Sequence, residues 1–430
     1  MTTLKKIYTI FCKNQLVTTD SRNVEKDSIF FALKGGNFNG NKFAADALNK
    51  GAAFAIIDEK EFYSTERTIL VDNVLETLTK LARLHRNKLG IPILAITGTN
   101  GKTTTKELIA SILSKKYNLS FTQGNLNNHI GVPLTLLKMN SETEFGVIEM
   151  GANHPGEIAA LCAIADPDYG IITNIGMAHL EGFGSFDGVK TTKGELYKYI
   201  QSKGGTIFYN KDNPILEELV QNIENKISFG SKNADLNGEL VPTPPFVHVK
   251  VNFKKGALYL NSYLIGDFNF ENILATACIG NYFGVDPLKI QQAIKEYYPK
   301  NNRSQLIEKN GRKIIMDAYN ANPTSMQASV KSFLASFPGP KTLILGDMLE
   351  LGKYSVQEHQ NILEILNHYS GHEVFLIGKN FVTVSEKSQY QSFENIEYFC
   401  EYLTNHKNLN KNILIKGSRG IRLEKVLDYL

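Results

Sequence analysis

The segment at residues 96–105, ITGTNGKTTT, combines glycines, one lysine and a run of hydroxyl side chains, which together suit phosphate binding. Gly98 and Gly101 allow backbone amides to approach phosphate oxygens closely. Lys102 would contact the β- and γ-phosphates, and Thr103 would ligate Mg²⁺. The first glycine of a full Walker motif is absent, so the match is a shortened G-x-x-G-K-T. The alternative interpretation is a plain glycine turn before a helix.

Two further polar side chains follow predicted strands in the same part of the chain. Glu149 stands at the end of FGVIEMG (145–151), and His179 follows YGIITNIG (169–176). Mg²⁺ takes oxygen ligands, so a carboxylate at a strand end suits a magnesium nucleotide. Taken alone, Glu149 is equally open to interpretation as a solvated strand-end acid, and a lone histidine such as His179 is more often an ordinary polar residue than a ligand.

The elements around the glycine segment favour a phosphate site. IPILAIT (91–97) predicts a short buried strand, and KTTTKELIASILSKKY (102–117) predicts a helix with one apolar face. A helix that begins at the lysine points the positive end of its dipole toward the loop. Strand, glycine turn and helix therefore form a phosphate-binding layout.

The pattern along the chain predicts an α/β protein of three domains, at residues 1–85, 86–300 and 301–430. Its 430 residues exceed one ordinary core. Apolar strands alternate with helical stretches in the central part, which predicts a mostly parallel sheet, with β-hairpins between 246 and 265. The segments KIIMDAY, KTLILGDM, EVFLIG and NILIKGS predict a Rossmann-like, doubly wound C-terminal domain.

Composition excludes several classes of protein. A formal charge of +4, without a basic tract, argues against a nucleic-acid-binding protein. The four cysteines lie far apart, which argues against a zinc site and a disulfide framework and fits a reducing cytoplasm. The N-terminus lacks the apolar core of a signal peptide, and no apolar run is long enough to cross a membrane. We expect a cytoplasmic monomer.

Several long motifs, in one order, carry a family resemblance. The segments ITGTNGKTTT, GNLNNHIGVPLTLL, VIEMGANHPGEI, ITNIGMAHLEGFGS and TKGELY together resemble the Mur ligases, from about residue 20 to the C-terminus. DAYNANPTSM, LGDMLELG and LIKGSRG resemble the branch of that family that acts last in extending the cell-wall precursor peptide. The rivals are the branch that adds the third residue and folylpolyglutamate synthase; DAYNANPTSM argues against both. A nucleotide-dependent binding or regulatory protein of the same fold is the rival from another class.

The resemblance implies an ATP-dependent amide ligase of peptidoglycan precursor synthesis. It implies that the chain joins D-alanyl-D-alanine to UDP-N-acetylmuramoyl-tripeptide through an acyl phosphate, with ATP and two Mg²⁺ ions. It also implies an N-terminal domain that binds the UDP-sugar, a central ATPase domain and a C-terminal domain that closes over the site.

The resemblance also assigns roles to residues by position. The catalytic residues would be Lys102, Lys193, His179 and Arg303, with Arg303 reaching the γ-phosphate. The ATP-binding residues would be Gly98, Thr99, Asn100, Gly101, Lys102, Thr103, Thr104, Asn269, Asn272, Arg303, Asp317 and Asn320. The magnesium ligands would be Thr103, Glu149, His179 and Lys193, the last as a carbamate (N6-carboxylysine). The substrate-binding residues would be Ser21, Arg22, Asn125, Asn128, Asn320, Asn322 and Lys416.

Some positions depart from the family pattern or have a simpler explanation. Phe268 and Asn41 stand where the family has histidines, and we assign no role to His129. Without the resemblance, Lys193 would be interpreted as an exposed helix lysine. The remaining alternatives concern three positions: helix capping by Asn269, surface salt bridging by Arg22, and helix capping by Asp347 in LGDM.

Overall fold

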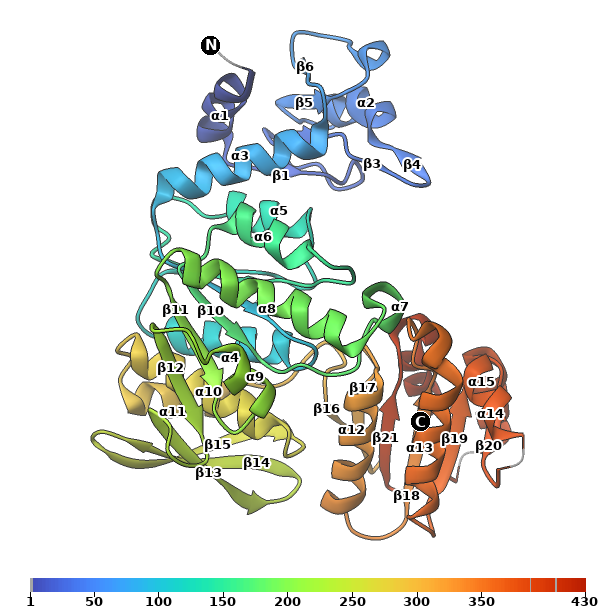
Figure 1. The fold of residues 1–430 in the computed structure, drawn as a ribbon. Helices are drawn as coiled ribbons and strands as arrows, with labels where there is room; N and C mark the ends of the chain where they lie inside the picture. Colours follow the sequence, from blue (N-terminus) through green and yellow to red (C-terminus); the bar gives the residue numbers. More distant parts are fainter. Residues whose placement is uncertain (1–2, 387, 407) are drawn as a thin grey trace.

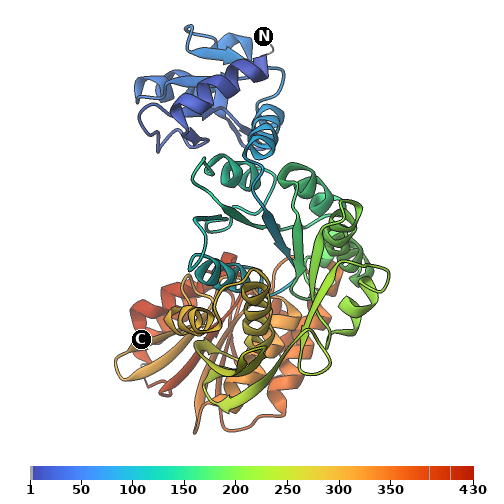
Figure 2. The ribbon, with the colours of Figure 1, turned by 90° about the vertical axis from the view of Figure 1, so that its left-hand side faces the viewer.

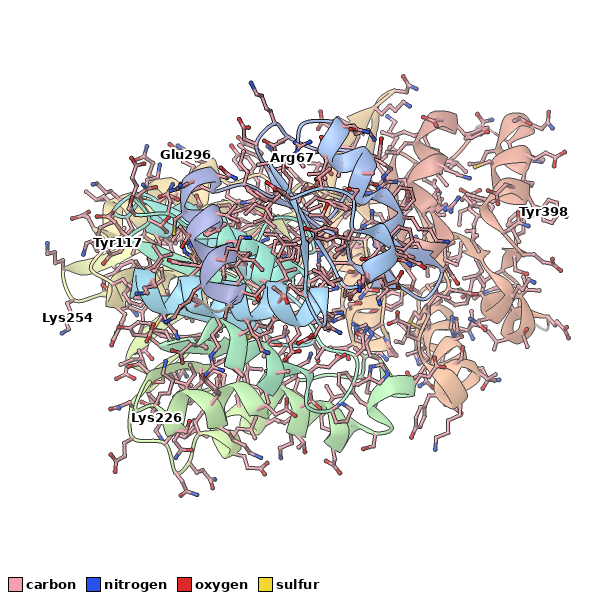
Figure 3. The ribbon with its side chains drawn as sticks, turned by 90° about the horizontal axis from the view of Figure 1, so that it is seen from above. Arg67, Tyr117, Lys226, Lys254, Glu296 and Tyr398 are labelled. Carbon is pink, nitrogen blue, oxygen red and sulfur yellow. The ribbon has the colours of Figure 1, made fainter. Side chains whose placement is uncertain are left out.

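A computed structural model describes residues 3–386, 388–406 and 408–430. It has three α/β domains, and the central domain separates the N-terminal and C-terminal domains in both side views (Figures 1 and 2). Seen from above, the N-terminal domain overlies the central domain and the C-terminal domain lies to one side, with Tyr398 at its far edge (Figure 3). In the part of the chain so described, no helix is long and apolar enough to cross a membrane.

The N-terminal domain contains a parallel sheet of order β1-β2-β5-β6, built from Val17–Thr18, Ile29–Phe31, Phe54–Ile57 and Thr68–Leu70. The hairpin β3 and β4 (Lys34–Gly35, Phe38–Asn39) and helices α1 (Thr3–Asn14) and α2 (Ala44–Asn49) complete it. Helix α3 (Val74–Leu89) leads to the central domain. Asn73 caps its first turn, and Gly90 ends it with a φ of 63°.

The central sheet has the order β15-β14-β13-β12-β11-β10-β7-β9-β8. Neighbours from β8 to β13 run parallel, whereas β13, β14 and β15 are antiparallel, so the predicted hairpin region is confirmed. The strands are Ile93–Thr97 (β7), Leu119–Phe121 (β8), Phe145–Glu149 (β9), Tyr169–Ile172 (β10), Thr206–Asn210 (β11), Lys226–Gly230 (β12), Leu236–Thr243 (β13), Phe246–Phe253 (β14) and Gly256–Ile265 (β15).

Helices cover both faces of this sheet. Two separate apolar clusters form, one with α3, α5 (Gly131–Leu137), α6 (Glu157–Ala165) and α8 (Phe186–Ser202), the other with α4 (Lys102–Leu113), α10 (Asn269–Tyr282) and α11 (Pro287–Glu296). Short helices α7 (Leu180–Phe183) and α9 (Pro214–Leu219) lie in connections. Burial of apolar side chains on both faces fixes the strand ends that carry the polar site.

The helix that follows the glycine segment is shorter than the pattern predicted. The sequence predicted a helix to residue 117, but α4 ends at Leu113. Turns follow, and the hydroxyl of Tyr117 donates to the carbonyl of Phe283 at 3.1 Å. This tertiary contact turns the chain toward β8, which helix periodicity alone could not predict.

The C-terminal sheet has the order β16-β17-β21-β18-β19-β20, with only β16 antiparallel among the strands that the described residues form. The strands are Gln305–Lys309 (β16), Arg312–Asp317 (β17), Lys341–Gly346 (β18), Glu373–Ile377 (β19), Gln391–Phe393 (β20) and Asn412–Lys416 (β21). Apolar clusters on its two faces include α12 (Pro323–Ser336), α13 (Ser355–Asn367) and α14 (Lys379–Ser385) on one side and α15 (Ile396–Asn405) on the other. The predicted Rossmann-like domain is confirmed.

Candidate active site

The glycine segment forms a tight loop between β7 and α4. Gly98 and Gly101 have φ angles of 142° and 78°, which side chains rarely allow. A Cβ atom on Gly98 would lie 2.0 Å from Thr173 Oγ1, and one on Gly101 would lie 2.6 Å from Asn272 Oδ1. The loop therefore requires glycine at both positions, and it ends where α4 offers its N-terminal amides.

Lys102 holds its charge over this loop. Its Nζ donates to the carbonyl oxygens of Gly98 at 2.6 Å and Thr99 at 3.0 Å. Burial lowers the pKa of Lys102 to about 8, because the charged form loses hydration. Such a cation gains most from an anionic partner that replaces the lost water.

Glu149 offers a buried carboxylate oxygen next to Lys102. Its Oε1 accepts hydrogen bonds from Thr103 Oγ1 at 3.2 Å and Asn127 Nδ2 at 2.8 Å. Its Oε2 is buried and has no hydrogen-bond partner among the described residues, although Lys106 Nζ lies 3.9 Å away. Because unpaired buried carboxylate oxygens are costly, the residues present fit a hard cation held by Thr103, Glu149 and phosphate oxygens.

The structure buries Lys193, contrary to its interpretation from local sequence as an exposed helix lysine. Only 2% of Lys193 is exposed, and its Nζ lies 5.5 Å from the centre of the Phe183 ring. Burial, together with the charge of Lys102, lowers its pKa to about 7. A large fraction of Lys193 is thus neutral near physiological pH, as a reactive amine requires.

His179 comes from the central domain and reaches the C-terminal domain. It precedes α7 and lines the same cavity as Lys102 and Glu149. Its Nδ1 contacts Glu350 Oε2, across 171 positions of sequence. Among the described residues, no three His, Cys, Asp or Glu side chains gather as a metal site by themselves, so a cation here also needs other oxygen donors.

Asp317 and Lys416 form a buried ion pair at neighbouring strand ends of the C-terminal domain. The two residues are partners in the parallel register of β17 and β21, and Lys416 Nζ lies 2.6 Å from Asp317 Oδ2. Ser329 Oγ and the amide of Ser304 also donate to Asp317, at 2.9 and 3.1 Å. Burial alone would raise the pKa of Asp317, but Lys416 and these hydrogen bonds lower it below its ordinary value.

The segment DAYNANP brings the C-terminal domain to the phosphate loop. Asn322 caps α12 by accepting from Ser325 N, and its Nδ2 donates to Asn100 Oδ1 at 2.8 Å. The Arg303 guanidinium stacks on the Tyr319 ring at 3.8 Å. Asn320 Oδ1 accepts from the amide of Ala321. The hydrogen bond between Asn322 and Asn100 joins the two domains, and the other contacts order the C-terminal side of the site.

One cavity of about 840 Å³ collects most of the predicted residues. Its lining includes residues predicted for ATP, cations and substrates: Thr99, Asn100, Gly101, Lys102, Thr103, Thr104, Asn125, Asn128, Glu149, His179, Asn269, Asn272, Arg303, Asp317, Asn320, Asn322 and Lys416. Gly98 and Lys193 are not part of this lining: Gly98 shapes the loop, and the charge of Lys102 helps to lower the pKa of the buried Lys193. The chain thus gathers a phosphate loop, cations and amides in one place.

Two asparagines of α10 form a linked pair in this cavity. Asn269 Nδ2 donates to Ile265 O, and Asn272 Nδ2 donates to Asn269 Oδ1, both at 2.9 Å. The alternative interpretation of Asn269 as a helix cap is wrong, because Phe268 occupies that position without a capping hydrogen bond. Phe268 lines the cavity and is 38% exposed. An aromatic face therefore stands where the family has a histidine.

Some predicted residues lie elsewhere. Ser21 and Arg22 belong to the N-terminal domain and are not in the cavity lining that the described residues form. The Arg22 side chain is 88% exposed and pairs with Asp20 at 2.8 Å. Asp347 accepts from the amides of Asn380 and Phe381, so it caps α14 as the alternative interpretation stated.

Sequence reasoning missed three residues around the cavity. Asn174 Oδ1 accepts from Asn100 N at 2.9 Å, and its Nδ2 donates to Asn100 O at 3.1 Å. Its place after β10 was a signal that could have found it. Tyr319 lies in the motif DAYNANP, but no local sequence pattern indicates its stacking with Arg303. No local pattern indicates the contact of Glu350 with His179 either.

Family models match most of the chain. The Mur ligase middle domain matches residues 96–280, the Mur ligase glutamate ligase domain matches 302–419, and the catalytic domain model of the Mur ligase family matches 14–86. These matches together span the regions of all three sheets.

Individual relatives agree with the family models. The UDP-N-acetylmuramoyl-tripeptide–D-alanyl-D-alanine ligase of Bacillus subtilis is 32% identical, over 96% of this chain and 92% of the relative. A crystal structure of MurF from Acinetobacter baumannii is 30% identical with a TM-score of 0.87, covering 96% of this chain and 92% of that one. MurF ligase from Thermotoga maritima in complex with ADP is 29% identical with a TM-score of 0.85, covering 100% and 98%.

Proposed function

Because the chain belongs to the Mur ligase family, we propose that it joins D-alanyl-D-alanine to UDP-N-acetylmuramoyl-tripeptide and converts ATP to ADP and phosphate. The observation that carries the proposal is the shared cavity, which is lined by Lys102 and Thr103 together with Asn322 and Lys416 of the segments DAYNANP and IKGSRG. Relatives of nearly full-length coverage bear the name of this activity. Precursor synthesis for peptidoglycan in the cytoplasm, by a monomer, is the biological setting that we propose.

The reaction proceeds in two steps. An oxygen of the tripeptide's terminal carboxylate attacks the γ-phosphorus of ATP, the bond to the β-phosphate oxygen breaks, and ADP leaves. The neutral amine of D-alanyl-D-alanine then attacks the acyl carbon, and phosphate leaves after a tetrahedral intermediate. The amine nitrogen loses one proton as the amide forms. Phosphorylation thus supplies the leaving group that a carboxylate lacks.

The protein contributes positioning and charge neutralisation. Lys102 and Arg303 offset charge on the transferred phosphoryl group, and the amides of the glycine loop hold the β-phosphate. Thr103 and Glu149 would hold one Mg²⁺, and His179 with Lys193 would serve a second. Bound Mg²⁺ offsets the charge of the ATP oxygens and of the attacking carboxylate.

We assign Lys193 as a carbamate in the active enzyme. Its neutral Nζ would bond to the carbon of carbon dioxide and release one proton, so that an uncharged amine becomes an anion with two carboxylate oxygens. Burial and the low pKa of Lys193 support this step, because only the neutral amine reacts. The product offers oxygen ligands, which Mg²⁺ prefers.

The remaining residues divide between the nucleotide and the two substrates. We assign adenine to the amides of Asn269 and Asn272, and the nucleotide also to Asp317 and Asn320. Asn125 and Asn128 would lie beside the tripeptide, while Asn320, Asn322 and Lys416 would meet the dipeptide. Lys416 would contact the dipeptide while it remains paired with Asp317, because the two side chains form a buried ion pair.

We further propose that residues 1–85 hold the UDP-sugar, 86–300 bind ATP and 301–430 complete the ligase site. Ser21 and Arg22 would bind the diphosphate, since a guanidinium offers a charged fork of donors. The high exposure of Arg22 leaves it accessible to such a ligand.

An ADP-release assay tests the proposed function. Purified protein is given ATP, Mg²⁺ and each of two UDP-muramoyl tripeptides, ending in lysine or diaminopimelate, with and without D-alanyl-D-alanine. We expect ADP and ligated product only with the dipeptide. Equal turnover with free glutamate or lysine as acceptor would overturn the assignment and favour the third-residue ligase or folylpolyglutamate synthase.

A further inference from the structure

Glu350 belongs to the C-terminal domain and lines the cavity, but it has no role in the reaction proposed for this site. It lies between β18 and the 3₁₀ turn η3 (Gly352–Tyr354), within the motif LGDMLELG. Its carboxylate contacts His179 Nδ1, and its backbone carbonyl accepts from the amide of Glu181 at 3.4 Å. Side chain and backbone of one residue thus join the C-terminal domain to the segment that begins α7, as the proximity of these elements in Figure 1 illustrates.

The backbone on both sides of this contact is in an uncommon conformation. His179 has a φ of 50° and Glu350 a φ of 63°, although neither is glycine. Each left-handed residue costs about 1 kcal/mol, so such a geometry persists where surrounding contacts fix it. Gly352 packs close to Glu181, since a Cβ atom there would lie 3.3 Å from Glu181 Cβ. The two loops are therefore matched in shape as well as in charge.

The His179 side chain is 25% exposed, whereas the Glu350 side chain is 57% exposed. An exposed ion pair would add little stability, so stability alone is a weak reason for this geometry. A carboxylate that accepts from one imidazole nitrogen has a second consequence, because it fixes the tautomer and ring orientation of the histidine. The proton then resides on Nδ1, and Nε2 carries the lone pair.

We propose that Glu350 is a positioning residue for His179: it holds Nδ1–H and thereby commits Nε2 to the cation of the active site. The inference rests on the proposed function, in which His179 serves a Mg²⁺ ion. Since Glu350 belongs to the C-terminal domain, the histidine is oriented for the cation only while that domain is docked. Docking of the C-terminal domain and assembly of the cation site are then one event.

The test measures cation binding directly and does not depend on ligation. Free Mn²⁺ is followed by electron paramagnetic resonance during titration of the full-length protein with saturating ADP and UDP-muramoyl tripeptide. We compare wild type with Glu350→Ala, Glu350→Gln and the control Glu364→Gln, an exposed carboxylate of α13 in the same domain. Second-sphere changes typically weaken metal affinity 10- to 100-fold, so we expect a loss of about that size for Glu350→Ala. Glu350→Gln, which keeps an acceptor oxygen, should lie between Glu350→Ala and the control.

A double-mutant cycle separates positioning from a general structural role. In a His179→Ala background, Glu350→Ala should change Mn²⁺ affinity less than twofold, because its target is gone. An equal loss in both backgrounds would overturn the proposal, as would a Glu350→Ala protein that binds Mn²⁺ like the Glu364→Gln control. If the wild type binds Mn²⁺ and nucleotide yet makes no product, the proposed function is wrong. The Mn²⁺ affinities of wild type and the Glu350 variants still test the role of Glu350 in that case.

Discussion

Asn322 Nδ2, in the C-terminal domain, donates a 2.8 Å hydrogen bond to Asn100 Oδ1, in the phosphate loop of the central domain. The same side chain accepts from Ser325 N with its Oδ1 and caps α12. One amide therefore uses its oxygen for local folding and its nitrogen for contact between domains. Substitutions can separate these two uses.

The change Asn322→Asp should damage catalysis without unfolding α12. Aspartate caps helices about as well as asparagine, but it cannot donate to Asn100 and places negative charge beside the phosphate loop. We expect turnover to fall at least about tenfold, because a misplacement of about 1 Å in a reactive site can cost about 100-fold. The melting temperature should change little. Steady-state kinetics and thermal unfolding measure both quantities.

A matched pair supplies the control for that experiment. Asn395 caps α15 by accepting from Tyr398 N, far from the cavity. Asn322→Ala and Asn395→Ala should each cost about 1 kcal/mol of unfolding free energy, but only the first should slow ligation. If Asn322→Asp kept wild-type turnover, the contact with Asn100 would have no role in the reaction.

Removal of the Lys102 charge should slow the reaction by two to three orders of magnitude. Lys102→Ala deletes the cation that would offset charge on the transferred phosphoryl group, a contribution of about 3 to 4 kcal/mol for one electrostatic donor. ATP-dependent ADP release and the circular dichroism spectrum are measured together, with the exposed Lys88→Ala as control. Near-normal turnover in a folded Lys102→Ala protein would eliminate the phosphate-loop assignment.

The local parts of the site could be predicted from sequence because they are continuous in the chain. Gly98 to Thr103 form one loop whose glycines are required by backbone angles and close contacts. Strand ends were predictable as well, and so Glu149 and Asp317 were found. The pairing of Asp317 with Lys416 was not, since it depends on the order β17-β21, which no short pattern determines.

Burial and domain contacts were beyond local patterns. Lys193 lies in an unremarkable helical segment, and its burial follows from packing near Phe183 at the end of α7. Glu350 meets His179 across 171 positions, so only the arrangement of two domains brings them together. The resemblance supplied a role for Lys193, but it supplied none for Glu350.

Ligands should make the molecule more compact. Ser21 and Arg22 lie in the N-terminal domain, at the opposite end of the molecule from the C-terminal domain, whereas one reaction must bring UDP-tripeptide and ATP together (Figures 1 and 2). We expect ADP with UDP-tripeptide to reduce the radius of gyration in small-angle scattering. An identical profile at saturation with both ligands would contradict closure of these domains.

The stability of the protein should depend on pH through Lys193. Its pKa falls from the ordinary 10.5 to about 7 on folding. Between pH 7 and pH 10.5 the unfolded chain therefore binds a proton at Lys193 that the folded protein lacks. Stability therefore rises with pH across this window, and the full cost of burying the charge applies below pH 7. That cost is at most about 5 kcal/mol, from 1.36 kcal/mol per unit of pKa.

The change Lys193→Met should remove the cost of burying this charge. It also tests the carbamate, because methionine has no amine that could react with carbon dioxide. In buffer free of carbon dioxide, the variant should exceed wild type in unfolding free energy at pH 6, and the difference should shrink steadily toward pH 10. Added bicarbonate at pH 8 should restore ligation to carbon-dioxide-depleted wild type, because most Lys193 amine is then neutral, but not to Lys193→Met. At equal dissolved carbon dioxide, recovery should be about tenfold slower at pH 6 than at pH 8, because about a tenth of an amine with a pKa of about 7 is neutral at pH 6. A constant stability difference from pH 6 to 10 would contradict the shifted pKa, and a fully active Lys193→Met enzyme would refute the carbamate.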